Sequence, residues 1–436
     1  MKIVIIGGSF GGISCAIEAR KIYPESEIVL IEKKAHIGFI PSGMLLYLEG
    51  KIPSLQDAFF CSKKQLEQLD IQVALQETML KLDPKNHFVQ TDQRRIAYDR
   101  LILAAGSAQE SEILLPMKEA ALTCKDYGAA KQFIQELDQA ETITIVGAGQ
   151  AGMEAANTLT ALGKQVQLVE SMTYPLFKYF DQSFLAPFLD ELAQIKNLQL
   201  YLAEPTIAIE STETGFRVET ANRTLLSALA LTTVNVRPRP HPAFQQLRLH
   251  SDHTIWTDAY LETSEKGIFA VGDLIQIYSP ITRDTAYMPL VNNAVRSGIA
   301  AAHNLQEKKE PFRGGLRTVG THLFGWYLAS TGMTESDRFF YEQEITVKKF
   351  TAKASLVDDT PIHGKLIIAK TSGQVLGAQL LSKYNLLEKI NLLAFAIEKE
   401  STLSELAQKD FFFHPHFTDV FELSNAIALG SAANEI

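Results

Sequence analysis

The chain has 436 residues, a length typical of two or three domains. Hydrophobic residues make up 46% and charged residues 21%, which provides apolar material for buried cores and argues against long disordered segments. The formal net charge of −9 comes from 41 basic and 50 acidic residues, a balance that argues against a protein that binds a nucleic-acid backbone.

The three cysteines, Cys15, Cys61 and Cys124, are widely spaced. They form no Cys-x-x-Cys pair, so the sequence indicates neither a disulfide framework nor a zinc site, and no histidines show metal-ligand spacing. No apolar run reaches the roughly 18 residues that a membrane-spanning helix needs. The apolar start is interrupted at Gly7 and lacks a signal-type cleavage site, so we expect a cytoplasmic protein without a membrane partner.

A strand–turn–helix–strand pattern opens the chain. Residues 2–6 are β-branched and apolar, residues 7–12 form a glycine-rich turn, and the helix that follows ends before Pro24. Residues 27–31 give the second strand, which ends on Glu32. Such a unit binds the pyrophosphate of a dinucleotide at the N-terminus of its helix, although a purely structural glycine turn is the alternative.

The residue types in this turn suit a nucleotide. Gly7 allows the tight turn, Gly12 allows close packing of helix on strand, and Ser9 is small enough for a close approach of phosphate to backbone. Glu32 stands where a carboxylate accepts hydrogen bonds from ribose hydroxyls.

The same pattern recurs from residue 142 onward. A strand at 143–146 precedes Gly147, Gly149 and Gly152, which complete the Gly-x-Gly-x-x-Gly fingerprint, and a second strand at 165–169 ends on Glu170. No arginine follows that acid, and a carboxylate there repels a 2′-phosphate. NADH is therefore expected rather than NADPH.

The segment after residue 306 differs in character. Residues 307–315 are charged and turn-rich and read as a linker. An α+β C-terminal domain is predicted for this part of the chain. The evidence is alternating stretches at 345–350 and 365–370, a Ser372-Gly373 turn and a helical pattern at 386–400.

Seven further segments stand in a characteristic order: YDRLILAAGS (98–107), FKYFDQSF (177–184), VRPRP (236–240), GIFAVGD (267–273), MPLVNNAVRSG (288–298), ASTGM (329–333) and DFFFHPHF (410–417). Together with the two turns, they resemble the pyridine nucleotide–disulfide oxidoreductase superfamily over essentially the whole chain. The most similar subgroup contains NADH oxidases, NADH peroxidases and coenzyme A-disulfide reductases.

The resemblance implies an α/β fold with two Rossmann-like domains and a C-terminal α+β dimerisation domain. FAD would be bound by residues 1–115 and 246–306 and NADH by residues 116–245, and residues 312–436 would form a homodimer. The FAD residues implied are Gly7, Ser9, Phe10, Gly11, Gly12, Glu32, Lys33, Pro41, Ser42, Ala105, Gly106, Asp273, Pro289 and Leu290. The NADH residues are Gly147, Gly149, Gln150, Ala151, Gly152 and Glu170.

Two of these assignments carry specific roles in the resemblance. The Asp273 carboxylate would hold a ribityl hydroxyl of FAD. Pro289 and Leu290 are expected to begin a helix whose N-terminus faces the flavin pyrimidine ring, where it stabilises negative charge.

The chain departs from the subgroup at its reactive position. The redox-active cysteine of the subgroup is replaced by Ser42, and the histidine that peroxidase-like members carry in the first turn is replaced by Phe10. A serine hydroxyl is not oxidised to a sulfenic acid as a thiol is. Phe10 and Pro41 make this place more apolar, which suits an apolar or aromatic acceptor, or they only fill space.

Four more side chains are candidates for a role in the reaction. Glu154 matches an acidic position near the nicotinamide in relatives, with an exposed helix residue as the alternative. Gln150 replaces the aromatic gate that relatives often place over the flavin. His414 or His416 would serve as an acid–base group, as in related disulfide reductases, or would only pack at the dimer interface.

We therefore expect a homodimeric FAD enzyme that oxidises NADH and passes the electrons to oxygen, with hydrogen peroxide as the main product. A reductase of a quinone or activated double bond, a reductase of a small redox protein, and a non-catalytic sensor of FAD and NADH remain as alternatives.

Overall fold

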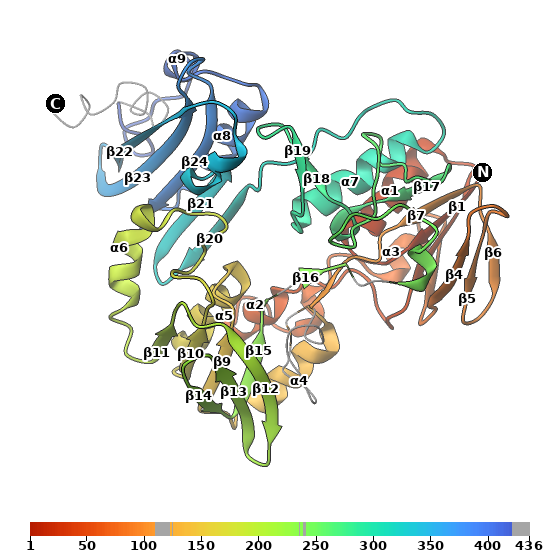
Figure 1. Cartoon of the computed structure of the whole chain (residues 1–436), viewed down its shortest axis with the longest axis horizontal. Helices are drawn as coiled ribbons and strands as arrows, with labels where there is room; N and C mark the ends of the chain where they lie inside the picture. Colours follow the sequence, from red (N-terminus) through yellow and green to blue (C-terminus); the bar gives the residue numbers. More distant parts are fainter. Residues whose placement is uncertain (110–122, 124, 235, 239–240, 421–436) are drawn as a thin grey trace.

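The structure, a computed structural model, describes residues 1–109, 123, 125–234, 236–238 and 241–420. The described residues form an α/β fold with two parallel sheets and an antiparallel C-terminal sheet, the fold class that the sequence predicts (Figure 1). Short elements connect them or lie at their edges: β8 (Ala108–Gln109), β16 (Val236–Arg237), η2 (Pro242–Phe244), η3 (Gly272–Leu274), β18 (Ile277–Ser279) and β19 (Asp284–Ala286).

The first domain is built on a five-stranded parallel sheet of order β17-β7-β1-β2-β3. Its strands are apolar along their length because both faces are covered, and Ile3, Val4 and Ile5 are completely buried. The elements are β1 (Lys2–Ile6), α1 (Phe10–Ile22), β2 (Glu27–Glu32), α3 (Lys63–Glu67), β3 (Ile71–Leu75), β7 (Arg100–Leu103), β17 (Ile268–Ala270) and α7 (Val291–Asn304), with an antiparallel sheet of β4 (Met79–Asp83), β5 (Phe88–Thr91) and β6 (Arg95–Ala97).

The second domain repeats the arrangement with a four-stranded parallel sheet of order β11-β10-β9-β15. Its elements are α4 (Tyr127–Leu137), β9 (Thr142–Val146), α5 (Gln150–Ala161), β10 (Gln165–Val169), α6 (Gln182–Leu192), β11 (Leu198–Tyr201), β12 (Thr206–Thr212), β13 (Gly215–Thr220), β14 (Thr224–Ser227) and β15 (Leu229–Thr232). The segment that carries α2 (Gly43–Leu48) and η1 (Leu55–Ala58) buries Met44, Leu45 and Leu55 in this domain's core, although it comes from the first domain's sequence.

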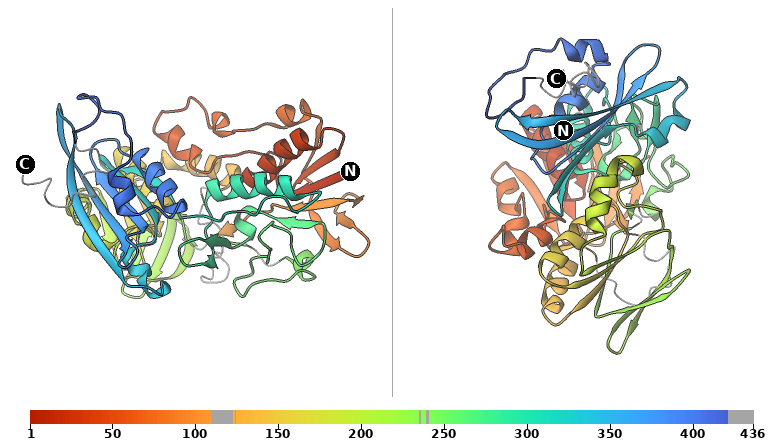
Figure 2. Two further views of the ribbon diagram at one scale, coloured as in Figure 1. Left: turned by 90° about the horizontal axis from the view of Figure 1, so that it is seen from above. Right: turned by 90° about the vertical axis from the view of Figure 1, so that its left-hand side faces the viewer.

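The C-terminal domain is a five-stranded antiparallel sheet of order β20-β21-β24-β23-β22 with helices on it, which Figure 2 shows from two sides. Its elements are β20 (Val319–Leu323), β21 (Trp326–Gly332), η4 (Glu335–Phe340), β22 (Ile345–Ser355), β23 (Asp358–Ala369), β24 (Val375–Ser382), α8 (Lys389–Glu398) and α9 (Leu403–Ala407). The helix predicted from Leu386 begins only at Lys389, because the Asn385 side chain accepts a hydrogen bond from the amide of Leu387 and holds a turn there.

Candidate active site

A cavity of about 1090 Å³ extends from the first parallel sheet to the second. It is lined by both glycine turns, by the start of α7 and by the segment before α2. The volume exceeds the ~300–1,000 Å³ of a pocket for one drug-sized ligand, so it has room for extended nucleotides.

The first glycine turn is shaped for backbone contact with a phosphate. Gly7 has φ +116°, and a Cβ atom there would lie 2.2 Å from the carbonyl oxygen of Ala104, so only glycine fits. A Cβ atom at Gly12 would lie 2.0 Å from the carbonyl oxygen of Gly7, which explains the close packing of α1 on β1. Ser9 is the N-cap of α1 and makes no side-chain capping bond, so the first amides of α1 remain available to an anion.

The second glycine turn repeats these features. Gly147 has φ +101°, and a Cβ atom at Gly152 would lie 1.9 Å from the carbonyl oxygen of Gly147. Gly149 is the N-cap of α5 and lines the cavity, and a Cβ atom there would meet no protein atom within 4 Å. The empty space beside Gly149 is therefore cavity, where a nucleotide can approach the backbone.

The two acids at the ends of β2 and β10 have matching hydrogen bonds. Glu32 accepts the amide of Gly8 at 2.7 Å and that of Lys34 at 2.9 Å. Glu170 accepts the amide of Ala148 at 2.7 Å and that of Met172 at 2.9 Å. Each carboxylate is fixed at the mouth of its turn and keeps further lone pairs for ribose hydroxyls.

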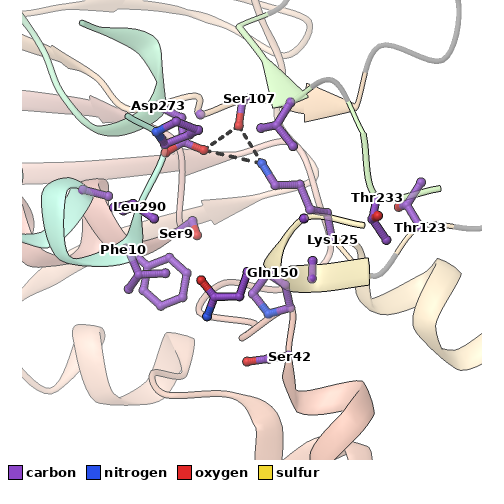
Figure 3. A pocket seen from close by; sticks show the side chains of 18 of the residues that line it. Ser9, Phe10, Ser42, Ser107, Thr123, Lys125, Gln150, Thr233, Asp273 and Leu290 are labelled. Carbon is purple, nitrogen blue, oxygen red and sulfur yellow. Dashed lines mark hydrogen bonds and ion pairs between the residues drawn. The ribbon is translucent and has the colours of Figure 1, made fainter. Parts of the chain in front are cut away.

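Asp273 forms a polar cluster with two other side chains (Figure 3). The Ser107 hydroxyl donates to Asp273, and the Lys125 ammonium lies 2.6 Å from Ser107 and 3.4 Å from Asp273. Burial lowers the pKa of Lys125, and the charge of Asp273 offsets part of that effect. This cluster provides a donor and acceptors to the cavity, with Asp273 beside Leu290 (Figure 3).

Phe10, Gln150 and Ser42 point into one part of the cavity (Figure 3). Ser42 is the N-cap of the short helix α2, is exposed to the cavity and makes no side-chain capping bond. The Phe10 ring stacks on the ring of Phe60, with centroids 4.9 Å apart and planes within 5°.

The two cysteines that the structure describes lie in cores rather than in the cavity. Cys15 is completely buried in α1, and burial raises the pKa of its thiol to about 12. Cys61 is 7% exposed, and burial raises the pKa of its thiol as well. Neither lines the cavity, and Cys124 falls outside the described residues.

Glu154 is tied to its surroundings and is not a free surface carboxylate. It accepts hydrogen bonds from the Gln150 amide at 3.0 Å and from the Thr321 hydroxyl of the C-terminal domain at 2.9 Å. The Gln150 amide also lies 3.4 Å from the carbonyl oxygen of Gly320. Gln150 is therefore held at the side of the cavity by two domains.

Most residues that the sequence points to meet at this one cavity. Those that line it are Gly7, Ser9, Phe10, Glu32, Lys33, Pro41, Ser42, Ala105, Gly106, Gly147, Gly149, Gln150, Ala151, Glu154, Glu170, Asp273, Pro289 and Leu290. Gly11, Gly12 and Gly152 do not line it and act through close packing. His414 is exposed on the C-terminal domain and does not line the cavity of its own chain.

A second predicted helix start, after that of α8, also differs from the structure. The helix expected to begin at Pro289 and Leu290 begins at Val291, because Leu290 has extended dihedral angles of φ −124° and ψ 144° and serves as the N-cap.

Several lining residues were not predicted from the sequence. Ser107 and Arg237 stand inside quoted motifs, so their motif membership was an available signal. Lys125 and His36 gave no such sequence signal, because only the folded chain brings them to the cavity. In the described part of the chain, no group of three His, Cys, Asp or Glu side chains is placed to hold a metal ion, and none of the described helices has the length and apolar character for a membrane span.

Comparison with known proteins identifies the class. Residues 1–298 match the family described as pyridine nucleotide-disulphide oxidoreductase, and residues 320–424 match the dimerisation domain of the same family. The chain belongs to this family and is an oxidoreductase.

Individual relatives agree with this assignment. An NADH oxidase of Enterococcus faecalis is 28% identical over 449 residues, with all of both chains covered. A crystal structure of a pyridine nucleotide-disulfide family oxidoreductase from Enterococcus faecalis is 36% identical with a TM-score of 0.88, covering 100% of this chain and 99% of the other. A water-forming NADH oxidase from Lactobacillus brevis, solved with NADH, is 26% identical with a TM-score of 0.94, covering 100% and 98%.

Proposed function

We propose that this protein is an FAD-dependent NADH oxidase that passes two electrons to oxygen without a redox cysteine. It is an oxidoreductase that acts on NADH, and its cofactors are FAD and NADH. The first glycine turn, Glu32 and Asp273 would hold FAD, and the second glycine turn and Glu170 would hold NADH. Bound FAD supplies a group that takes a hydride from NADH and releases two electrons to an acceptor.

The chain's own residues supply positioning and electrostatics. The glycine turns bring backbone amides to the phosphates, and the acids orient the riboses. The N-terminus of α7, at Leu290 and Val291, lines the cavity and favours negative charge next to it. Gln150 and Glu154, fixed by Thr321, border the part of the cavity that Phe10 and Ser42 share.

Among the residues that the structure describes, no thiol lies in the cavity beside Ser42, and this observation carries the proposal. Both described cysteines are buried outside the cavity, and the position that would hold a reactive thiol presents a hydroxyl. The balanced reaction is then NADH + H⁺ + O₂ → NAD⁺ + H₂O₂, because formation of water needs two further electrons that a redox thiol would mediate.

Anaerobic titration of the purified holoenzyme with NADH tests this proposal. We expect the visible flavin absorbance to be lost after uptake of two electrons per FAD, with no long-wavelength band between a thiolate and the flavin. Readmission of air should then yield one hydrogen peroxide per NADH. Uptake of four electrons would refute the cysteine-free mechanism.

We further propose that the protein is a homodimer located in the cytoplasm. Residues 320–424 match the family's dimerisation domain, and this domain exposes large apolar side chains such as Phe395, Phe412 and Phe413. Sedimentation equilibrium of the holoenzyme should give twice the chain mass, and a monomer at micromolar concentration would contradict this. The geometry of this dimer decides whether His414 of one chain lies at the cavity of the other chain.

A further inference from the structure

Two basic side chains line the cavity beside the second glycine turn. The first is Lys178, which stands in the segment between β10 and α6 and is exposed to the cavity. Its segment is joined to the turn, because the amide of Leu176 donates a hydrogen bond to the carbonyl oxygen of Ala148 at 2.9 Å. Lys178 is therefore held two residues away from a backbone contact with the turn.

The second basic side chain is Arg237 of β16. Its segment also contacts the turn, since the hydroxyl of Thr233 donates to the carbonyl oxygen of Gly147 at 3.0 Å. The Arg237 guanidinium stacks on the ring of Tyr287, 4.9 Å from the ring centroid, and its Nη1 donates to the carbonyl oxygen of Val236 at 3.2 Å. Stacking fixes the plane of the guanidinium and leaves N–H groups at its edge for a phosphate.

The two cations lack a carboxylate partner among the residues that the structure describes. By contrast, Arg317, which lines the same cavity, forms an ion pair with Asp337. Desolvation lowers the pKa of Lys178, and the charge of Arg237 lowers it further. Glu170 raises this pKa but does not offset the other two effects, and its carboxylate is already held by two backbone amides. The two positive charges therefore repel each other, and a doubly charged anion would compensate both.

We propose that Lys178 and Arg237 form a clamp that binds the diphosphate of NADH. This inference rests on the proposed function, which assigns NADH to the second glycine turn. The diphosphate carries two negative charges, which match the two cations of the clamp. The amides at the N-terminus of α5, where Gly149 provides no side-chain cap, would bind the same group. The clamp thus supplies charge to the phosphates, and Glu170 supplies acceptors to the ribose.

Binding without electron transfer tests the clamp. Oxidised holoenzyme is titrated calorimetrically with ADP-ribose, which has the diphosphate but no nicotinamide, and with adenosine, which has no phosphate. Lys178→Met and Arg237→Gln should each weaken ADP-ribose binding roughly tenfold, because each removes a charge-assisted hydrogen bond. Adenosine binding should remain unchanged in both variants. Lys178→Arg keeps the charge and should bind ADP-ribose like wild type.

Ionic strength provides a second measurement. Added salt should weaken ADP-ribose binding to wild type more than to Lys178→Met, because screening acts on a charge that the variant lacks. Lys196→Met is the matched control, since Lys196 is an exposed lysine of the same domain that does not line the cavity. This control should leave both the affinity for ADP-ribose and its salt dependence unchanged.

The inference is overturned if wild type does not bind ADP-ribose, or if either clamp variant binds it as tightly as wild type does. Equal losses of ADP-ribose and adenosine affinity would place the effect on the adenosine end or on the fold, and equal losses in Lys178→Met and Lys196→Met would show nonspecific attraction; both results also overturn it. If NADH fails to reduce the bound FAD, the proposed function fails. If NADH reduces FAD and the clamp variants bind ADP-ribose like wild type, only this inference fails.

Discussion

Ser42, together with Phe10, is where we expect this chain to differ from the thiol-based proteins that it resembles. It caps a short helix, faces the cavity and lies in the same region as Phe10 and Gln150 (Figure 3). The neighbouring backbone is already suited to a reactive group, because the N-terminus of a helix lowers the pKa of a thiol. At this position the chain lacks thiol chemistry because a hydroxyl oxygen stands in place of a sulfur atom, while the backbone around it has the same shape that a reactive thiol would use.

Ser42→Cys should restore a second redox centre. After treatment with one equivalent of hydrogen peroxide, the variant should take up four electrons per FAD on anaerobic NADH titration, because a sulfenic acid accepts two electrons and becomes a thiol and water. Ser42→Ala, treated in the same way, should take up two. Equal uptake by both variants would show that the cavity does not support thiol chemistry.

Glu170 is the residue that should set the choice between NADH and NADPH. Its carboxylate is only 6% exposed and is held by Ala148 and Met172. Glu170→Gln removes the charge that repels a 2′-phosphate and keeps an oxygen acceptor for one of these two amides, which bond to different carboxylate oxygens. We expect the ratio of kcat/KM for NADH over NADPH to fall by about tenfold, equivalent to about 1.4 kcal/mol.

Steady-state kinetics with both nucleotides measure this change. Glu219→Gln removes a carboxylate from β13 of the same domain, which is not part of the cavity, and should leave the ratio unaltered. An unchanged ratio in Glu170→Gln would mean that the shape of the cavity, rather than this charge, excludes the 2′-phosphate.

At the scale of elements, the FAD-binding half depends on the contact between α1 and α7. A Cβ atom at Gly298 would lie 2.3 Å from the carbonyl oxygen of Gly11 and 3.2 Å from the amide nitrogen of Cys15. Gly298→Ala should therefore push the two helices apart and destabilise the holoenzyme by about 1–3 kcal/mol, the usual cost of overpacking. Retention of FAD should fall as well, because both helices begin at the cavity.

Urea denaturation of the holoenzyme and release of FAD during gel filtration measure the two effects. Ile299→Ala changes the next residue of α7, on its exposed side, and should alter stability by less than about 0.5 kcal/mol. If Gly298→Ala is as stable as wild type, α1 and α7 can separate at no cost, and the close contact has no structural role.

The sequence predicted these elements well where the signal is local. The two glycine turns, the strands beside them and the acids Glu32 and Glu170 follow from spacing alone, because a βαβ unit is closed by residues near one another in the chain. The start of α7 was misplaced by two residues because the extended backbone of Leu290 leaves no mark in its residue type. The burial of Met44 and Leu45 in the second domain's core could not be predicted, since that contact joins distant segments.

The cavity itself shows the same division. Residues in glycine turns were recognised, whereas Lys125 and Phe60 were not, because their partners are far away in sequence: Asp273 for Lys125 and Phe10 for Phe60. Long-range pairings of single side chains are invisible to periodicity and motif spacing.

At the scale of the whole molecule, a buried ion pair joins the second and C-terminal domains. Lys365 is completely buried in β23, and its ammonium lies 2.7 Å from Asp181, the N-cap of α6, and 2.7 Å from Glu335 of η4. Asp181 also accepts a hydrogen bond from Gln379 at 2.6 Å. Breaking a buried pair leaves an uncompensated charge, so Lys365→Met should destabilise the holoenzyme by about 3 kcal/mol at pH 7.

Lower pH should reduce the difference in the free energy of unfolding between wild type and Lys365→Met. Burial alone would raise the pKa of Asp181, but hydrogen bonds from Lys365 and Gln379 outweigh burial and lower it. A lowered folded-state pKa gives stability that is complete above the unfolded value of about 3.9 and is lost as the pH falls through the folded value. Without Lys365, the charge and hydrogen bond that most oppose the effect of burial are lost, so we expect the pKa of Asp181 to rise and the variant to regain stability as the carboxyl is protonated on the way down from neutral pH.

Urea denaturation of both proteins with excess FAD between pH 7 and pH 4 measures the difference in the free energy of unfolding. The gap between wild type and Lys365→Met should narrow steadily over that interval, because protonation of Asp181 removes the uncompensated charge only in the variant. Lys383→Met provides the control: it breaks the exposed ion pair with Glu191, 2.8 Å long, and should cost less than about 1 kcal/mol. A gap for Lys365→Met that does not change with pH would show that the loss comes from packing in β23 and not from the buried carboxylate.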